Sequence, residues 1–554
     1  MVPWIAVVGG IGATALAVSA LLALLRAIYT SVPLVPPTPD MLRSERHERS
    51  ALLRAYPSLI RSIAWRSLVR TESGATPVHR CSVTLPESGR TAFFWAKRED
   101  VSAPLRYAGN KVRTLEFSLA CIEAKLARRS SSSRARDGAG RTLVLGSGGS
   151  NFVLATVAHA RRFGARLGAS LEPLWVSKDK NSDADNTLNV LSALSFSEAL
   201  AFGDEDERSQ SNHISRSSRI SPDGRGAAPR ALWAERCGGA TALRKIGRAL
   251  LCERRSTVLP PGGNSIAGAL GHVGAALELA EQIASGAAPS PTEIYLTVGS
   301  GCTLVGLVVG IALARARDAA AFAHLDALHA QVIHHALAAI QRGTAGWCGS
   351  RGALRSRRVA LLGVGAGVCA VCSALREHGG SSMPDVAAAA LRFLDTRVVF
   401  ATDAPTVATY GAHSAASAAA AAVYAASGRV AASPVGSLAG PPVGSPLGPS
   451  SEGRADDAPP LWLCGHFTAK TFALMLRILE RDTRGERRAL FWSTKSVTQP
   501  RAAATPLARV WRRFTQLHGF PAVARWANRG GGGIDAGDEV ASLRTFAARS
   551  TPVE

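Results

Sequence analysis

Short apolar runs alternate with glycine-rich turns and helical stretches from about residue 92 onward. Residues 141–146 (RTLVLG) predict a buried strand, the following SGGS a turn, and 151–164 (NFVLATVAHARRFG) a helix that Gly164 ends. The strand–turn–helix order recurs at 293–316 and again from 358 (RVALLGVGAG). Further strands are predicted at 171–177 and 489–494. Strands that alternate with helices are typical of βαβ units, so the sequence predicts an α/β protein.

The first 25 residues contain no charged side chain. At about 1.5 Å per residue, a helix of this length spans a bilayer core of about 30 Å. Positive charge begins only at Arg26, so the positive-inside rule predicts a single-pass transmembrane anchor at 1–30 with the rest of the chain in the cytosol. A cleaved or organellar targeting segment stays the alternative. A proline-rich connector and a helix at 41–70 are predicted to follow within 31–70.

Three segments interrupt the βαβ pattern and are predicted to be inserts. Residues 203–230 are charged and rich in Ser and Arg, and 316–356 contain a helix-like stretch with four histidines. Residues 411–460 pass from an alanine run into a Pro/Gly/Ser-rich segment, which predicts a disordered linker, with 425–460 as the insert. The histidines do not share one helical face with carboxylates, so we predict solvated or capping residues and no metal site. Cys369 and Cys372 form a CxxC, but no second ligand pair accompanies it, so we interpret both as buried apolar cysteines.

The length of the chain bears on its number of domains, and its charge on the class of binding partner. A chain of 554 residues predicts two or more domains. The net charge of +23 could indicate nucleic acid or anionic lipid as a partner. However, only eight of the 64 basic residues are lysines and no basic stripe is interleaved with aromatic residues, so we predict no nucleic-acid binding. The scarcity of lysine draws attention to each one that is present, Lys111 in particular.

Three polar motifs at strand–helix turns carry candidate chemistry. In TVGSGCTLVG, the residues Gly299, Ser300, Gly301, Cys302 and Thr303 could wrap a phosphate at a helix N-terminus. Taken alone, a glycine-rich turn is a weak signal. Lys111 follows a Gly-Asn pair, and the pair Ser150-Asn151 follows a second glycine-rich turn. Together these parts could hold pyridoxal 5'-phosphate: the lysine as Schiff-base amine, the loop for the phosphate and Asn151 for the ring hydroxyl.

The stretch 94–120 (FWAKREDVSAPLRYAGNKVRTLEFSLA) resembles the family of 1-aminocyclopropane-1-carboxylate (ACC) deaminases and D-cysteine desulfhydrases. There, a KRED-type strand end precedes a GGNK segment with the cofactor lysine. Six more motifs follow in the family's order: 143–164 (LVLGSGGSNFVLATVAHARRFG), 258–279 (VLPPGGNSIAGALGHVGAALEL), 297–307 (TVGSGCTLVGL), 409–414 (TYGAHS), 463–476 (LCGHFTAKTFALML) and 490–496 (LFWSTKS).

The resemblance implies a two-domain fold-type II pyridoxal-phosphate enzyme, similar to the tryptophan synthase β-subunit. The large cofactor-binding domain would comprise 71–115 and 257–500, the small α/β domain 116–256, and 501–554 would form a variable tail. It further implies a small amino acid as substrate, β-elimination to ammonia and a 2-oxo acid, and a possible homodimer.

The resemblance also implies roles for single residues. Lys111 would bond the cofactor and carry a proton at Cα, and Ser150 would be a base or a carboxylate binder. Tyr410 would stand beside the substrate, and Thr494 near the pyridine nitrogen. Asn151 and residues 299–303 keep the roles given above.

Several positions depart from the family pattern, mostly on the substrate side. Phe467 stands where the family has a second tyrosine, Thr468 replaces the glutamate associated with ACC deaminase, and the terminal HTGG has become residues 493–496 (STKS). Thr468 favours a D-cysteine desulfhydrase-like activity, whereas Phe467 and the altered HTGG motivate the alternative of altered or lost catalysis. ACC deaminase activity, and a pyridoxal-phosphate-binding protein with altered or lost catalysis, stay the alternatives.

Overall fold

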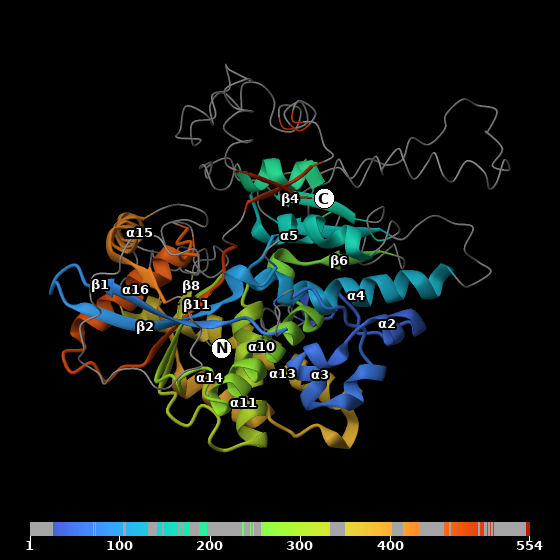
Figure 1. Cartoon of the computed structure of the whole chain (residues 1–554). Helices are drawn as coiled ribbons and strands as arrows, with labels where there is room; N and C mark the ends of the chain where they lie inside the picture. Colours follow the sequence, from blue (N-terminus) through green and yellow to red (C-terminus); the bar gives the residue numbers. More distant parts are fainter. Residues whose placement is uncertain are drawn as a thin grey trace, which may run out of the picture.

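The chain forms a mixed α/β structure around a central sheet, which confirms the predicted class (Figure 1). The description rests on a computed structural model. It covers residues 26–69, 71, 74–103, 107–130, 141–146, 149–163, 167, 171–176, 188–196, 235–237, 244, 248, 256–332, 350–401, 414–431, 459–464, 467–496, 499–503, 507, 510, 514 and 550–553.

The larger sheet has seven strands in the order β10-β1-β2-β11-β7-β8-β9. The strands are β1 (Val78–Thr84), β2 (Thr91–Arg98), β7 (Glu293–Val298), β8 (Ala327–Val332), β9 (Val398–Ala401), β10 (Arg429–Val430) and β11 (Ala489–Ser493). The β1–β2 pair and the β1–β10 pair are antiparallel, whereas β2, β11, β7, β8 and β9 run parallel to one another. Strand β11, from the predicted run 489–494, therefore lies at the centre of the sheet.

Side chains along β7 alternate between the two faces of this sheet, as the two-residue period of a strand requires. Ile294 and Leu296 belong to one apolar core, with α10 (Ile266–Ala284) and α11 (Cys302–Arg317). Tyr295 belongs to a second core, with α15 (Ala415–Ser427) and α16 (Thr468–Arg481). Both faces are therefore covered by helices, which explains why β7 is buried along its whole length.

The smaller sheet has four parallel strands in the order β5-β4-β3-β6. They are β3 (Thr142–Gly146), β4 (Leu171–Val176), β5 (Glu235–Cys237) and β6 (Thr257–Leu259). Helix α5 (Asn151–Ala160) follows β3 as predicted, and α4 (Asn110–Ser130) runs between the two sheets (Figure 1). Strand β6 begins at 257, so the smaller sheet continues three residues past the boundary predicted at 256. The other domain boundaries stay predictions.

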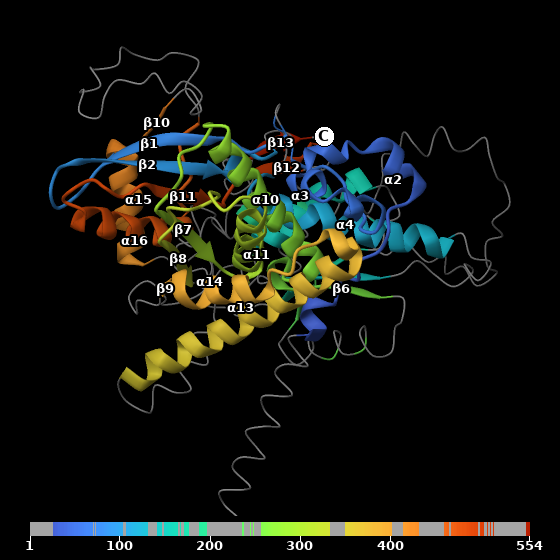
Figure 2. The same ribbon diagram turned by 90° about the horizontal axis from the view of Figure 1, so that it is seen from below.

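Two predicted elements are wrong near the N-terminus and at 358–367. Residues 41–70 do not form one helix: they form short pieces, α2 (Pro39–Ser44), η1 (His47–Arg49), α3 (Ala51–Ala55) and η2 (Pro57–Arg61). Pro57 cannot continue α3, because its ring removes a backbone donor. The run RVALLGVGAG is not a strand and turn but part of α13 (Ser350–Gly379) (Figure 2). Along this part of α13, the buried valines Val364, Val368 and Val371 have helical spacing.

The insert predicted at 316–356 is also wrong in part. Residues 327–332 form β8, a buried strand between β7 and β9, and His329 stacks on Tyr295 of β7. The histidine stretch therefore belongs partly to the core sheet. Helix α14 (Ala387–Arg397) precedes β9, and β12 (Pro500–Ala502) pairs with β13 (Thr551–Val553), which gives the predicted tail some regular structure.

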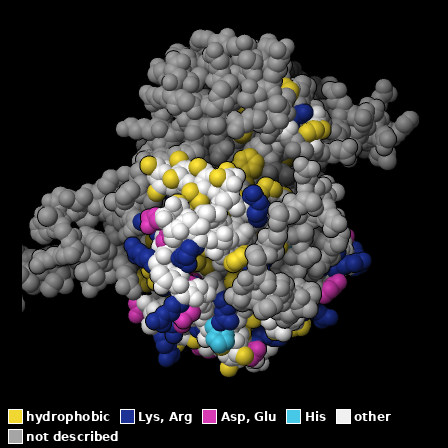
Figure 3. Space-filling model, turned by 60° about the vertical axis from the view of Figure 1, so that its left-hand side comes forward, with side chains coloured by type: hydrophobic (Ala, Val, Ile, Leu, Met, Phe, Trp, Pro, Cys, Tyr) yellow, Lys and Arg dark blue, Asp and Glu magenta, His cyan; other side chains and the backbone are white. Residues whose placement is uncertain are grey.

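Of the CxxC, Cys372 is buried as predicted, whereas Cys369 is exposed. Among the described residues, no three His, Cys, Asp or Glu side chains gather as a metal site. No helix in the described ranges is both long and apolar enough to cross a bilayer. Residues 1–25 of the anchor predicted at 1–30 and the insert at 203–230 lie outside those ranges, as do 432–458 of the predicted linker. The described part of that linker, 414–431, forms α15 and β10, which pairs with β1, so the prediction of disorder is wrong there. On the face shown in Figure 3, basic and acidic side chains are interspersed, and nucleic-acid binding stays untested.

Candidate active site

Lys111 lies in the first turn of α4, where a tight backbone approach fixes the start of the helix. The preceding Gly109 has a φ of +99°, and a Cβ there would lie 2.5 Å from the carbonyl oxygen of Thr494. The backbone N–H of Asn110 donates to the same Thr494 oxygen at 3.2 Å. Only glycine allows this approach. The Gly-Asn-Lys motif therefore joins the start of α4 to the segment that follows β11.

The amine of Lys111 has a neutral partner. Its Nζ donates to the carbonyl oxygen of Gly262 at 3.3 Å, and its side chain is partly exposed. Burial of the amine lowers the pKa of Lys111 below its usual value. A lysine that loses its proton more readily is a better nucleophile, as a covalent cofactor lysine requires.

Gly262 brings Lys111 next to the glycine-rich loop. Its φ is +68°, and a Cβ added there would lie 2.5 Å from Ser300 Oγ and 3.7 Å from Lys111 Nζ. On the next residue, Gly263, a Cβ would lie 2.7 Å from the ring of Phe152 at the start of α5. Lys111, the 260–264 turn, the 299–303 loop and α5 therefore meet at one place.

The 299–303 loop opens α11 in a form suited to an anion. Its N-cap, Gly301, has a φ of +89° and no side-chain cap, and the first turn carries no acidic residue. A Cβ on Gly299 or Gly301 would meet nothing within 4 Å. The Cys302 N–H lies 3.5 Å from Ser300 Oγ, within the loop itself. The N–H groups at the start of a helix favour negative charge, so the first turn of α11 suits an anion.

Two residues of this loop point inward instead. The hydroxyl of Thr303 accepts from Asn110 Nδ2 at 2.9 Å and lies 3.3 Å from His272 Nε2. The thiol of Cys302 is buried and donates to Gly263 O at 3.4 Å. Burial, with Lys111 and Arg113 nearby, lowers the pKa of His272 well below its usual range, so this imidazole is neutral. Sequence reasoning missed His272, which links α10 to the starts of α4 and α11.

Ser150 and Asn151 begin α5, as predicted. Ser150 Oγ lies 3.5 Å from the backbone N–H of Val153, a weak N-cap contact. The side-chain oxygen of Asn151 accepts from Tyr107 Oη at 2.7 Å, from Asn189 Nδ2 at 2.7 Å and from Lys495 Nζ at 3.1 Å. None of these three partners was predicted. They come from three distant segments, and only the rarity of lysine singled out Lys495 in the sequence.

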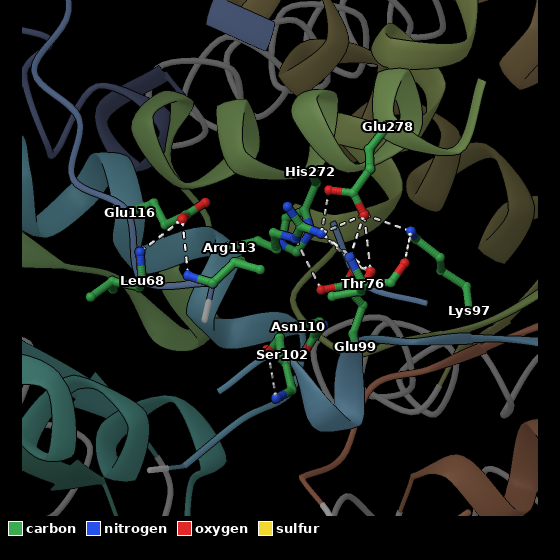
Figure 4. A network of polar contacts seen from close by, with 12 residues as sticks. Leu68, Thr76, Lys97, Glu99, Ser102, Asn110, Arg113, Glu116, His272 and Glu278 are labelled. Atoms are coloured by element: carbon green, nitrogen blue, oxygen red, sulfur yellow. Dashed lines mark hydrogen bonds and ion pairs between the residues drawn. The ribbon is translucent and has the colours of Figure 1, made fainter. Parts of the chain in front are cut away.

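A buried ion network joins α4 to α10 and to the end of β2 (Figure 4). Arg113, one half-turn after Lys111, pairs with Glu278 of α10 at 2.8 Å and with Glu99 at 3.0 Å. Lys97 pairs with Glu278 at 2.6 Å. Burial alone would raise the pKa of Glu278, but Arg113 and Lys97 outweigh it and hold this pKa low. Two residues of the KRED motif, Lys97 and Glu99, thus have a positioning role, because they help to hold Arg113 and the helix that carries Lys111.

Most of the predicted cofactor-contacting residues share one property: they are partly exposed, although most of their neighbours are buried. The partly exposed positions are Lys111, Asn151, Gly299, Ser300, Gly301 and Thr494. The structure joins all of these segments through the contacts described above. Tyr410 lies outside the described residues. Phe467 is the partly exposed N-cap residue of α16, and Trp462 of the same segment lies 6.0 Å from Lys495 Nζ, measured to its ring centroid.

These donors fit pyridoxal phosphate. A lysine of lowered pKa stands beside a glycine-lined helix start, and Gly262 lies next to both. Lys111 could bond the aldehyde, and the loop amides could hold the phosphate. The predicted residue roles stay predictions, because contacts with a ligand would be needed to test them.

Curated relatives support this reading over part of the chain. A D-cysteine desulfhydrase from Yersinia enterocolitica is 29% identical over 238 residues, which cover 43% of this chain and 57% of the relative. A nocardicin C-9' epimerase from Nocardia uniformis is 32% identical over 222 residues, 39% of this chain and 52% of the relative. The chain therefore spans only about half the length of the curated relatives it matches. Similarity to D-cysteine desulfhydrases is confirmed over that stretch.

No family model matches the chain. A crystal structure described as an ACC deaminase homologue aligns over 81% of this chain and 94% of its own, with 16% identity and a TM-score of 0.41.

Proposed function

We propose that this protein is a fold-type II pyridoxal-phosphate lyase that acts on a small amino acid, as a D-cysteine desulfhydrase does, and releases ammonia and a 2-oxo acid. The observation that carries the proposal is the meeting of Lys111 Nζ and Ser300 Oγ at Gly262. A lysine of lowered pKa beside a glycine-lined helix start supports the binding of an aldehyde that carries a phosphate. The similarity to D-cysteine desulfhydrases supports the same assignment.

The chain's own residues would divide the work as follows. Lys111 would bond the cofactor and move a proton at the substrate's Cα. Residues 299–303 would bind the phosphate, Asn151 the ring hydroxyl, and Thr494 the ring nitrogen. Ser150 would bind the substrate carboxylate or act as a base, and Tyr410 would stand beside the substrate. When bound, pyridoxal phosphate supplies an electron sink for negative charge at Cα.

The residues expected on the substrate side of the site distinguish best between desulfhydrase and ACC deaminase activity. Phe467 has no hydroxyl for proton transfer where the family has a tyrosine. Thr468 Oγ1 accepts from Cys464 N at 2.8 Å and donates to Trp462 O at 3.1 Å, so its hydroxyl serves its own turn. Thr468 therefore does not offer the substrate a polar group in place of the glutamate associated with ACC deaminase. Desulfhydrase-type elimination is the preferred assignment; ACC deaminase activity and lost catalysis are its alternatives.

Covalent cofactor binding is the first test. The purified full chain, mixed with pyridoxal phosphate, should show a visible absorbance band at about 410–420 nm. Borohydride treatment followed by peptide mass spectrometry should place the cofactor on Lys111. Lys111→Ala should lose both signals. Lys125→Ala is the matched control, because Lys125 lies farther along α4, where it donates to Thr257 Oγ1 at 2.8 Å. Label retained in Lys111→Ala would contradict the assignment.

Turnover is the second test. In D-cysteine elimination the Cβ–S bond breaks, and hydrolysis of the resulting enamine gives pyruvate and ammonia beside sulfide. Pyruvate and sulfide from D-cysteine are the expected products, with D-serine and ACC assayed in parallel. Product from ACC alone would favour the deaminase, and no 2-oxo acid from any of them would favour lost lyase activity. Because one relative is an epimerase, loss of optical activity without 2-oxo acid would identify an epimerase instead.

We also propose that residues 1–25 anchor the chain in a membrane with the catalytic part in the cytosol, possible organellar targeting being the alternative. The support is the uncharged apolar sequence before Arg26. The full chain should stay in the membrane fraction after alkaline carbonate extraction, and its recovery in the supernatant would contradict this. A homodimer is the family-based expectation, and light scattering of the detergent-extracted chain tests it.

A further inference from the structure

Four polar side chains form a compact group beside the candidate site, which we call the Asn151 cluster: Tyr107, Asn151, Asn189 and Lys495. Lys495 is 4% exposed. Its Nζ donates to Tyr107 Oη at 3.1 Å, to Asn151 Oδ1 at 3.1 Å and to Asn189 Oδ1 at 3.3 Å. The aromatic rings of Tyr107 and Trp462 flank the ammonium group, with centroids 5.4 and 6.0 Å away. The cluster therefore holds a buried lysine amine against an amide oxygen.

The orientation of the Asn151 side chain follows from these contacts. A side-chain amide has one oxygen with two lone pairs and one NH₂ group with two donors. Three donors converge on the Asn151 oxygen, from Tyr107, Asn189 and Lys495. The oxygen is fully used inside the cluster, so the NH₂ group must face away from it. Toward any ligand, Asn151 can therefore act only as a hydrogen-bond donor.

Residues of the Asn151 cluster are close neighbours of candidate-site residues in the sequence. Lys495 directly follows Thr494, whose carbonyl oxygen receives the Asn110 N–H, and Gly109 and Lys495 pair as an isolated β-bridge. Tyr107 lies four residues before Lys111. Lys495 thus lies next to two residues proposed to contact the cofactor: Thr494 in the chain and Asn151 through its amine.

We propose that Lys495, Tyr107 and Asn189 are positioning residues that fix the Asn151 amide as a donor to the ring oxygen of bound pyridoxal phosphate, and that the charge of Lys495 favours that oxygen in its ionised form. This inference rests on the proposed function, because it needs the cofactor at this site. An ammonium group that polarises an amide strengthens the hydrogen bond that the amide donates, since such bonds are cooperative in a low dielectric.

Other titratable groups around the cluster belong to the elements that pack against it. They are His159 of α5, whose Nε2 lies 2.8 Å from Tyr107 O, Cys464 of the Trp462 segment, and Lys111 itself. A substitution that changes only Lys495 separates its charge from theirs.

The test compares Lys495→Met with the unaltered full chain, both loaded with pyridoxal phosphate. The visible absorbance band is followed as pH is varied. Without the nearby cation, protonation of the bound cofactor should shift to higher pH by about 1–3 units, the range known for loss of a close opposite charge. Lys495→Arg keeps the charge and should shift it less. Lys125→Met, which removes a remote lysine from α4, should leave the titration unchanged and controls for loss of one lysine.

The outcomes separate this inference from the proposed function. If no visible band forms in the unaltered chain, the proposed function itself is wrong. If the band forms and Lys495→Met titrates like the unaltered chain, Lys495 has no influence on the cofactor and the inference is overturned. Should Lys495→Met fold poorly, Asn189→Asp provides a second route: it puts a negative charge against Lys495 and should also shift the titration to higher pH. An unchanged titration in a folded Asn189→Asp chain would likewise overturn it.

Discussion

At the scale of single residues, Glu116 shows how a buried carboxyl makes stability depend on pH. It lies on α4, is 4% exposed, and its Oε1 accepts from the backbone N–H groups of Leu68 at 2.9 Å and Val69 at 3.2 Å. Burial raises the pKa of Glu116 to about 7, although Arg113 and the two N–H groups lower it in part. The folded state therefore holds this proton more tightly than the unfolded chain does.

The sign of the effect follows from linkage. A carboxyl whose pKa is raised on folding stabilises the protein below its unfolded value, 4.5, and loses this contribution as pH rises through about 7. Glu116→Gln keeps the acceptor but removes the ionisation. Between pH 5 and pH 8, we expect the free energy of unfolding of the variant to rise relative to that of the wild type by up to ~3 kcal/mol. The melting temperature of the variant should rise relative to that of the wild type over the same range.

Scanning calorimetry at several pH values checks this prediction. Glu281→Gln serves as a control for the loss of one negative charge, because Glu281 lies on α10 in a solvent-exposed ion pair with Arg54. A difference between wild type and Glu116→Gln that stays constant from pH 5 to pH 8 would show that Glu116 is not protonated in the folded state.

At the scale of elements, the sequence predicted best where apolar periodicity and glycine turns agree. Helices α5 and α11 and strands β3, β4, β7 and β11 lie where the pattern placed them. Their turns carry glycine at positions of positive φ, such as Gly149 and Gly301, which is a local signal. Elements of this kind are defined by neighbouring residues, so a single sequence contains the information.

The wrong predictions arose where the local signal is ambiguous. A short apolar run with glycines, as at 358–367, fits a strand and a buried helix equally well by pattern. Its packing against α11 and α14 decides for a helix. Similarly, the alternation at 327–332 was hidden by the helix-like spacing of histidines around it, and pairing with β7 and β9 decides for a strand. Tertiary contacts determine both, and the sequence shows none of them.

The candidate site divides in the same way. Lys111 and residues 299–303 could be predicted, because each lies in a local motif. His272, Tyr107, Asn189 and Lys495 could not, because their importance comes from side-chain contacts between segments far apart in the chain. Lys495, for example, contacts a residue more than 300 positions away in sequence.

At the scale of the whole molecule, the site depends on five segments that approach one another only in the folded chain: 107–113, 149–153, 260–265, 299–304 and 493–496. Gly109 joins the first to the last, Gly262 joins the first to the 299–304 segment, and Gly263 contacts the start of α5. A ligand that fills the space between them should therefore restrict all five segments together.

Hydrogen exchange measured by mass spectrometry tests this on the full chain. Addition of pyridoxal phosphate to the cofactor-free protein should slow amide exchange in all five segments, whereas the turn between α13 and α14 (380–386) should not change. Pyridoxal, which lacks the phosphate, should protect 107–113 but leave 299–304 unaffected, because those amides would have no anion to bind. Equal protection by both ligands would mean that 299–304 does not bind the phosphate. Protection of a single segment would mean that the five do not form one site, and the assembly inferred from Gly109, Gly262 and Gly263 would be wrong.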